Sequence, residues 1–114
     1  MNIEELRTYC ISKEFATESF PFDESTLVFK VVKMFALVNI EKKEFINLKN
    51  DPDENLELRA SYEGIKPGYH MSKKHWNSVY FNHDVDDELL KKLIDTSYEM
   101  IRASLTKKER ENLK

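Results

Sequence analysis

The strongest constraint on the fold is an amphipathic pattern near the C-terminal end of the chain. Over residues 89–105 the apolar side chains keep the spacing of one helix face for about five turns. Such a helix must bury its apolar face against a second layer, so a layered domain is predicted. The basic tail, about residues 106–114, is expected to fray. Acidic residues crowd the predicted start, where the helix dipole favours negative charge: Asp84, Asp86, Asp87 and Glu88.

The second layer is predicted from residues 26–49, in which β-branched and aromatic side chains dominate. We interpret this segment as three strands joined by two hairpins. The first two strands carry almost continuous apolar runs, so both faces of the sheet are expected to be largely covered. Pro21 excludes residues 19–25 from the centre of a strand. The first hairpin turn, near Val32 and Lys33, has neither the Gly nor the Asn that tight turns favour.

Two further helices are indicated by their capping residues. The first covers about residues 2–13, begins at Asn2 and buries Cys10, whose thiol is expected to pack in the core and not to react. The second begins at the Asp-Pro-Asp-Glu run of residues 51–54, which resembles a capping box. It is predicted to end at Gly64 in the left-handed conformation.

Two short strands, residues 65–69 and residues 76–81, are predicted after this second helix. The element order is then α-β-β-β-α-β-β-α, and the predicted fold class is α+β with an antiparallel sheet packed by helices. A chain of 114 residues fits one domain, residues 1–114. One cysteine excludes an internal disulfide, and two glycines exclude glycine-rich phosphate loops. The apolar runs are too short for a membrane span, and we expect a cytoplasmic monomer.

Several motifs together resemble the MmcQ/YjbR family. The most specific is Pro-Gly-Tyr-His-Met-Ser-Lys-Lys-His-Trp-Asn-Ser-Val at residues 67–79. The others are Phe-Pro-Phe at residues 20–22, the apolar segments 26–31 and 33–37, Asn-Leu-Lys-Asn-Asp-Pro at 47–52, and Asp-Thr-Ser-Tyr at 95–98. The similarity extends over nearly the whole chain.

This resemblance implies a small α+β fold similar to type III secretion chaperones and to the frataxin-like protein CyaY. It also implies a DNA-binding protein, because the family's fold is compared with a double-wing arrangement, and it implies no catalytic residue. The chain departs from the usual family pattern at Asp23, Val32 and Asn50. These departures concern turn geometry and leave the expected fold unchanged.

The basic segment of residues 59–76 is the candidate nucleic-acid site. Four basic residues stand there against one glutamate, a net charge of +3 with the histidines neutral. Double-stranded DNA would be the partner, with phosphate contacts from Lys73 and Lys74, flanking contacts from Arg59 and Lys66, and sugar or base contacts from His75 and Trp76. The overall charge of −3 and the pI near 5.7 argue against this hypothesis.

The competing interpretation leaves Lys73 and Lys74 as a solvated loop and places Trp76 in the core. The chain would then be a protein-interaction module or a small-ligand-binding domain. DNA binding requires the basic residues of segments 59–75 and 107–110 to converge on one surface. Protein binding requires an exposed apolar patch or a free strand edge, and ligand binding requires a polar-lined pocket near Tyr69, His70 and His75.

The remaining titratable groups form no catalytic or metal-binding pattern. His70, His75 and His83 lack the i, i+4 spacing of a helical zinc site. The acidic clusters are explained by their positions at helix starts, and no Gly-x-Ser-x-Gly motif is present. We therefore expect no enzyme, no cofactor and no metal site. His70 is expected to hold its loop through a hydrogen bond to the backbone.

Overall fold

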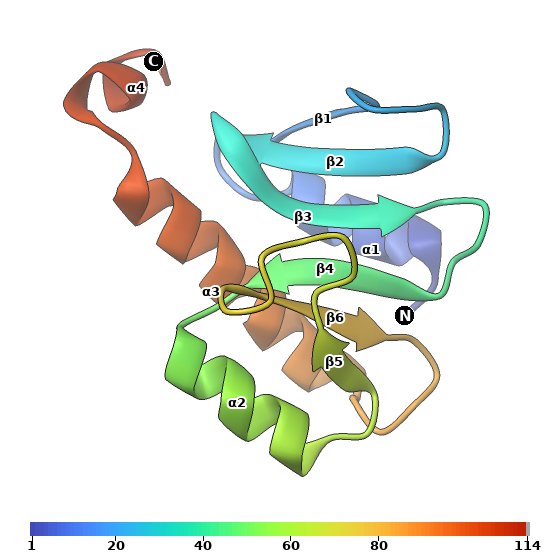
Figure 1. Cartoon of the computed structure of the whole chain (residues 1–114). Helices are drawn as coiled ribbons and strands as arrows, with labels where there is room; N and C mark the ends of the chain where they lie inside the picture. Colours follow the sequence, from blue (N-terminus) through green and yellow to red (C-terminus); the bar gives the residue numbers. More distant parts are fainter. Residues whose placement is uncertain (114) are drawn as a thin grey trace.

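In the computed structural model, which describes residues 1–113, six strands form one sheet that helices cover on one face (Figure 1). The strands lie in the order β1-β2-β3-β4-β6-β5, and each neighbouring pair is antiparallel. The strands are β1 (Thr17–Ser19), β2 (Thr26–Val31), β3 (Lys33–Asn39), β4 (Phe45–Lys49), β5 (Ile65–Pro67) and β6 (Trp76–Tyr80). The helices are α1 (Ile3–Ile11), α2 (Pro52–Ser61), α3 (Asp87–Ser104) and α4 (Lys107–Glu111). The predicted α+β fold class is confirmed.

Helices α1 and α3 pack on the same face of the sheet and enclose the main core. Leu6 and Cys10 of α1 are buried there with the apolar stripe of α3 and the inward side chains of β2, β3, β4 and β6. Asn2 caps α1 through a capping box with Glu5, as the sequence indicated. Burial raises the pKa of the Cys10 thiol to about 12, which keeps it protonated and confirms that it is a packed core group.

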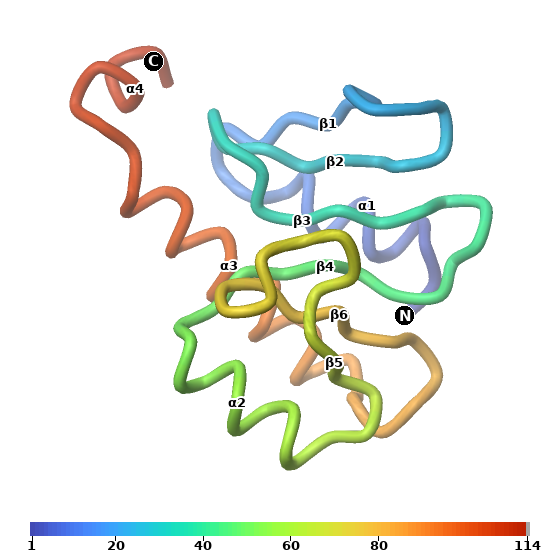
Figure 2. Tube along the Cα trace, viewed as in Figure 1, coloured from blue at the N-terminus to red at the C-terminus, as the bar shows by residue number. Residues whose placement is uncertain are grey.

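The opposite face of the sheet is covered by residues 68–75 of the same chain, which we call the covering loop. This loop crosses in front of β4 (Figure 2). Val28, Leu37 and Trp76 form a second, smaller buried cluster, with Met71 of the loop packed on it. Both faces of the sheet are therefore buried in part, as the continuous apolar runs predicted.

A β-bulge explains why β3 does not alternate between buried and exposed residues. Phe29 stands opposite Ala36, whereas Lys30 stands opposite Met34, so Phe35 is the extra residue on β3. Phe35 and Ala36 are consequently both buried in the main core. The Phe35 ring there meets the ring of Tyr98 edge to face, with centroids 5.3 Å apart.

Strand β1 was not predicted from the sequence. It has three residues, two of them exposed, and pairs along the outer side of β2, with Thr17 opposite Lys30. A polar Thr-Glu-Ser run carries no apolar alternation, so nothing local distinguishes it from a loop. Pro21 lies in the connection that follows β1 and outside the sheet, as predicted.

The first hairpin turn is made in a strained way. Val32, between β2 and β3, has φ of +69°, a left-handed conformation that β-branched residues rarely adopt. The same region is occupied by Lys43 in the second hairpin turn, where φ is +54°. A turn of this geometry normally holds Gly or Asn, and neither residue stands at these two positions.

Helix α2 begins as predicted but ends differently. The Asp51 carboxylate accepts hydrogen bonds from the backbone N–H groups of Asp53 and Glu54. The second bond of a capping box, from the Asp51 N–H to the Glu54 side chain, is absent. The Asp51 N–H donates instead to the side-chain oxygen of Asn50. The prediction that Gly64 ends the helix in the left-handed conformation is wrong, since the helix is already capped at an extended Tyr62 and Gly64 has no positive φ.

Gly64 is needed for a close approach between two segments. A Cβ atom at Gly64 would lie 2.7 Å from the Cβ of His83. The carboxylate of Asp84 accepts hydrogen bonds from the backbone N–H groups of Glu63 and Gly64, each at 2.8 Å. Asp84 therefore holds the segment that follows α2 against the segment that precedes α3, whereas Asp86 caps α3.

The C-terminal basic residues form a short helix, α4, after the end of α3. Helix α3 ends at Ser104, and an extended Leu105 leads to a capping box formed by Thr106 and Glu109 at the start of α4. Glu109 also lies 3.7 Å from Lys33, which places α4 beside the β2–β3 turn. Residues 107–111 of the tail expected to fray thus form a short helix, and whether this helix frays stays a prediction; residue 114 lies outside the described residues. Within residues 1–113 no helix is long and apolar enough to cross a membrane.

Candidate functional site

Two of the predicted phosphate-contacting residues are occupied in holding the covering loop. The Arg59 guanidinium, on α2, donates to the side-chain oxygen of Asn77 at 2.6 Å, to the backbone oxygen of Trp76 at 3.3 Å, and to the backbone oxygen of Lys73. The Lys73 ammonium donates to the backbone oxygen of Gly68 at 2.7 Å. Both cations thus satisfy carbonyl groups of the covering loop or of the strand that follows it.

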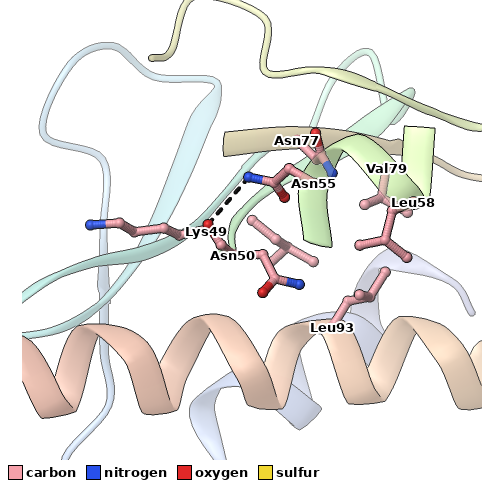
Figure 3. Close-up of a pocket in the computed structure, with 8 residues that line it drawn as sticks. Lys49, Asn50, Asn55, Leu58, Asn77, Val79 and Leu93 are labelled. Atoms are coloured by element: carbon pink, nitrogen blue, oxygen red, sulfur yellow. Dashed lines mark hydrogen bonds between the residues drawn. The ribbon is translucent and has the colours of Figure 1, made fainter. Parts of the chain in front are cut away.

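Asn55 ties the same loop to α2 from the inside. Its amide donates to the backbone oxygen of Asn50 at 3.2 Å (Figure 3). It also donates to the backbone oxygen of Lys74 at 3.1 Å. The cavity beside it is only about 10 Å³, room for about one water molecule. Among the residues described, Asn55 Oδ1 and Asn77 Nδ2 have no hydrogen-bond partner, and both residues line this cavity. This space belongs to the packing of α2 and is too small for a ligand.

The other predicted nucleic-acid contacts differ in their exposure. Lys66, Lys74 and His75 are exposed, but Trp76 is only 9% exposed and packs in the second cluster. The basic helix α4 lies at the opposite end of the molecule from α2 and β5 (Figure 1). The basic residues of α4 are therefore not brought beside α2 and β5.

The edges of the sheet offer little for a partner strand. β1 and β5, at the two edges, have three residues each. Pro67 in β5 also lacks the backbone N–H that strand addition would use. Short edge strands of this kind disfavour pairing with another chain.

A groove of about 740 Å³ lies on the sheet face that the covering loop crosses. Its walls come from the β1–β2 connection, from β3 and β4 with the turn between them, from β6, and from the covering loop. Its lining residues are Phe22, Asp23, Thr26, Met34, Leu37, Val38, Asn39, Lys42, Glu44, Phe45, Asn47, Tyr69, His70, Met71 and Tyr80. We call it the aromatic groove.

The floor of the aromatic groove is fixed by a buried polar network. Asn47 donates to the backbone oxygen of Tyr69 at 3.2 Å and accepts from the Ser78 hydroxyl at 2.5 Å. The Ser78 oxygen in turn accepts from the Tyr69 backbone N–H at 2.9 Å. Asn47 and Ser78 are almost completely buried, so these bonds are shielded from water and hold the covering loop in one position.

Aromatic rings gather around Phe45 in this groove. The Phe45 ring lies 5.9 Å from the ring of Tyr69 and 5.0 Å from that of Tyr80, centroid to centroid. Tyr69 is 56% exposed, and Phe22 on the other wall is 64% exposed. Large exposed aromatic side chains on both walls of a concavity are typical of binding sites.

His70 belongs to the groove and does not take the role predicted for it. Within residues 1–113 its side chain makes no hydrogen bond to the backbone; its ring centroid instead lies 4.1 Å from that of Tyr69. Its backbone has φ of +59°, a conformation in which His is found more often than most residues. His75 lies outside the groove, so only part of the predicted trio of Tyr69, His70 and His75 lines a pocket.

Three charged side chains line the groove: Asp23, Lys42 and Glu44, all exposed. The Asp23 carboxylate accepts hydrogen bonds from the backbone N–H groups of Thr26 and Ser25, and these bonds lower its pKa. Asp23 is therefore held in its charged form. Over residues 1–113, no group of three or more His, Cys, Asp or Glu side chains is placed to hold a metal ion.

Sequence reasoning named Tyr69 and His70 but missed Phe22, Phe45, Asn47 and Tyr80. A signal was present for Phe22, because it follows Pro21 in a segment that cannot enter the sheet and so has no core to fill. No comparable signal exists for the others, whose positions on strands are equally consistent with a buried face.

The sheet, the helices on one face and the covering loop on the other define a small α+β domain. The YjbR family profile matches residues 11–100, and the chain belongs to this family. It is 31% identical to the uncharacterized protein YjbR of Escherichia coli K12 over 115 aligned residues, 99% of this chain and 98% of that protein. It is 37% identical to the uncharacterized protein YbdF of Escherichia coli O157:H7 over 97 residues, 83% of this chain and 80% of that protein.

Solved structures have the same fold. The crystal structure of Deinococcus radiodurans protein DR2400, a DUF419 domain, superposes with a TM-score of 0.90 at 39% identity and covers 98% of this chain and 87% of that one. A crystal structure of a Pseudomonas syringae protein gives a TM-score of 0.77 at 27% identity, over 90% of this chain and all of the other. The names of these relatives assign no activity.

Proposed function

We propose that this chain is a ligand-binding protein that holds a small organic molecule with a planar or apolar group in the aromatic groove. The observation that carries the proposal is the groove itself. Its volume, about 740 Å³, falls within the range of roughly 300–1,000 Å³ that is common for small-molecule sites. Eight of its fifteen lining residues are aromatic, aliphatic or thioether residues and the other seven are polar or charged, so the lining offers both apolar surface and groups that can orient a ligand.

The groove also has the rigidity that binding favours. The hydrogen bonds of Asn47 and Ser78 hold the covering loop from the groove side, and those of Arg59 and Asn55 hold it from the α2 side. A ligand would therefore meet walls that are already in place. Binding to such a site costs little conformational entropy, so a weakly interacting small molecule can still be retained.

Titration with para-tert-butylphenol, followed by amide proton–nitrogen correlation spectra, tests this proposal. We expect saturable shifts at groove residues such as Asn47, Tyr69 and Met71. Phe22→Ala should weaken binding about three- to tenfold through the loss of an aromatic contact. Phe20→Ala is the matched control, because Phe20 is also exposed but does not line the groove. Shifts that fall mainly outside the groove, or a failure to saturate both with this phenol and with a cation of the same shape, would overturn the proposal.

Nucleic-acid binding is the second candidate, favoured by one observation. Lys66, Lys74 and His75 are exposed, and within residues 1–113 their side chains make no ion pair or hydrogen bond of the protein's own. They could therefore contact phosphates. We place this candidate second because Arg59, Lys73 and Trp76 are engaged in the fold and the chain is acidic overall.

A further inference from the structure

We propose that the aromatic groove selects an organic cation, an ammonium group carried on an apolar or aromatic body. This inference rests on the proposed function, because it names the class of ligand for the same groove. It is drawn from the arrangement of the aromatic rings and from the charges that line the groove.

The rings around Phe45 are tilted and do not stack on it, which leaves part of their π-surface uncovered. The planes of Phe45 and Tyr69 meet at 76°, and those of Phe45 and Tyr80 meet at 49°. In a tilted or edge-to-face pair the two rings do not stack, so a face of at least one ring stays uncovered by that partner. The His70 ring lies 4.1 Å from the Tyr69 ring and covers part of it, but Tyr69 is still 56% exposed and Phe45 and Tyr80 are half-buried, so part of this aromatic surface is open to a ligand. A cation within about 6 Å of such a face is attracted by the quadrupole of the ring.

The charges on the walls favour the same kind of ligand. Asp23 and Glu44 contribute two carboxylates, and Lys42 is the one cation among the lining residues of the described chain. The N–H groups that bind the Asp23 carboxylate keep its pKa low and so favour its charged form. The electrostatic field of the whole protein also favours a cation, since the chain carries a net charge of −3.

A phosphate or carboxylate ligand fits this lining less well. An anion would bring its charge close to the carboxylates of Asp23 and Glu44 and would have only Lys42 as a counter-ion. A bare metal ion is also disfavoured, because the two carboxylates come from different connections and no third ligand of the usual type joins them within residues 1–113. An ammonium on an apolar body uses both the rings and the carboxylates.

A pair of probes with the same shape isolates the effect of charge. (para-Hydroxyphenyl)trimethylammonium and para-tert-butylphenol differ in one atom, a cationic nitrogen in place of a carbon. At low salt we expect the cation to bind about tenfold more tightly than the neutral phenol, which is the order of magnitude of cation–π attraction. Tyr69→Leu should remove most of this preference and leave part of the affinity for the phenol.

The carboxylate contribution has its own matched control. Glu44→Gln should lower the preference for the cation about threefold, as expected for an exposed charge in partial contact with solvent. Glu41→Gln changes an exposed carboxylate in the same turn that does not line the groove, and it should have no effect.

The outcomes separate the two proposals. If the neutral phenol binds as tightly as the cation or more tightly, the selection of cations is overturned and the groove remains a ligand site. If neither probe gives saturable binding in the groove, the proposed function itself is overturned, and the cation inference with it.

Discussion

At the scale of single residues, Val32 is under strain in the folded chain. A β-branched side chain in the left-handed region costs roughly 1–2 kcal/mol relative to an extended backbone. Val32→Gly removes this cost but adds freedom to the unfolded chain, so we expect a net stabilisation of about 0.5–1 kcal/mol. Urea unfolding of both proteins measures it. Val32→Ala, which keeps a Cβ atom, should gain clearly less, and equal gains from both variants would contradict the strain argument.

Asp84 makes the stability of the protein dependent on pH. Its pKa in the folded state lies below the ordinary value of 3.8, because the N–H groups of Gly64 and Glu63 bind the carboxylate. The charged form is thus favoured by folding, and this stabilisation is complete above pH 3.8 and lost as the pH falls through the lower folded pKa. The difference in unfolding free energy between the wild type and Asp84→Asn should therefore be largest near neutral pH and shrink in acid. A difference that stays constant with pH would contradict this assignment.

At the scale of elements, the covering loop depends on side chains from outside it. Arg59→Met removes the donors that bind the Trp76 and Lys73 carbonyls, and we expect a destabilisation of about 1–3 kcal/mol. Amide hydrogen exchange should become faster in residues 69–75 than elsewhere in the sheet. Lys74→Gln is the control, since the Lys74 side chain is exposed, and it should change neither quantity. Equal effects of both variants would mean that Arg59 acts only through surface charge.

The elements that could be predicted from the sequence are those with local signals. Capping residues predicted the starts of α1 and α2, and the periodicity predicted α3. β1 and the true end of α2 could not be predicted, because they depend on contacts with β2 and with the Asp84 segment. The roles of Ser97 and Tyr98 could not be predicted either: Ser97 bridges the backbones of Phe35 and Lys49, and Tyr98 donates to the Glu14 carbonyl.

At the scale of the whole molecule, the aromatic groove is the feature that was hardest to predict from the sequence. Its lining is spread over residues 22–80 and is brought together only by the strand order and by the path of the covering loop. From the sequence alone, the most specific motif of the chain, residues 67–79, is interpreted as part of a basic segment that binds nucleic acid. In the folded chain, its Gly68 and Lys73 shape the covering loop, whereas its Tyr69 and His70 face the groove.

The distribution of charge gives the last prediction. If the groove is the functional site, a labelled random-sequence duplex and its matching single strand should show no binding by fluorescence anisotropy, even at low salt, where electrostatic attraction is least screened. Within the candidate nucleic-acid site only Lys66 and Lys74 are exposed lysines without a bond to the fold, too few to offset the repulsion between nucleic acid and a chain of charge −3. The informative variant is Lys66→Glu/Lys74→Glu, because both side chains are exposed and neither holds the covering loop. Micromolar binding that weakens with salt and disappears in this variant would instead establish the second candidate function and make the groove a separate feature of the fold.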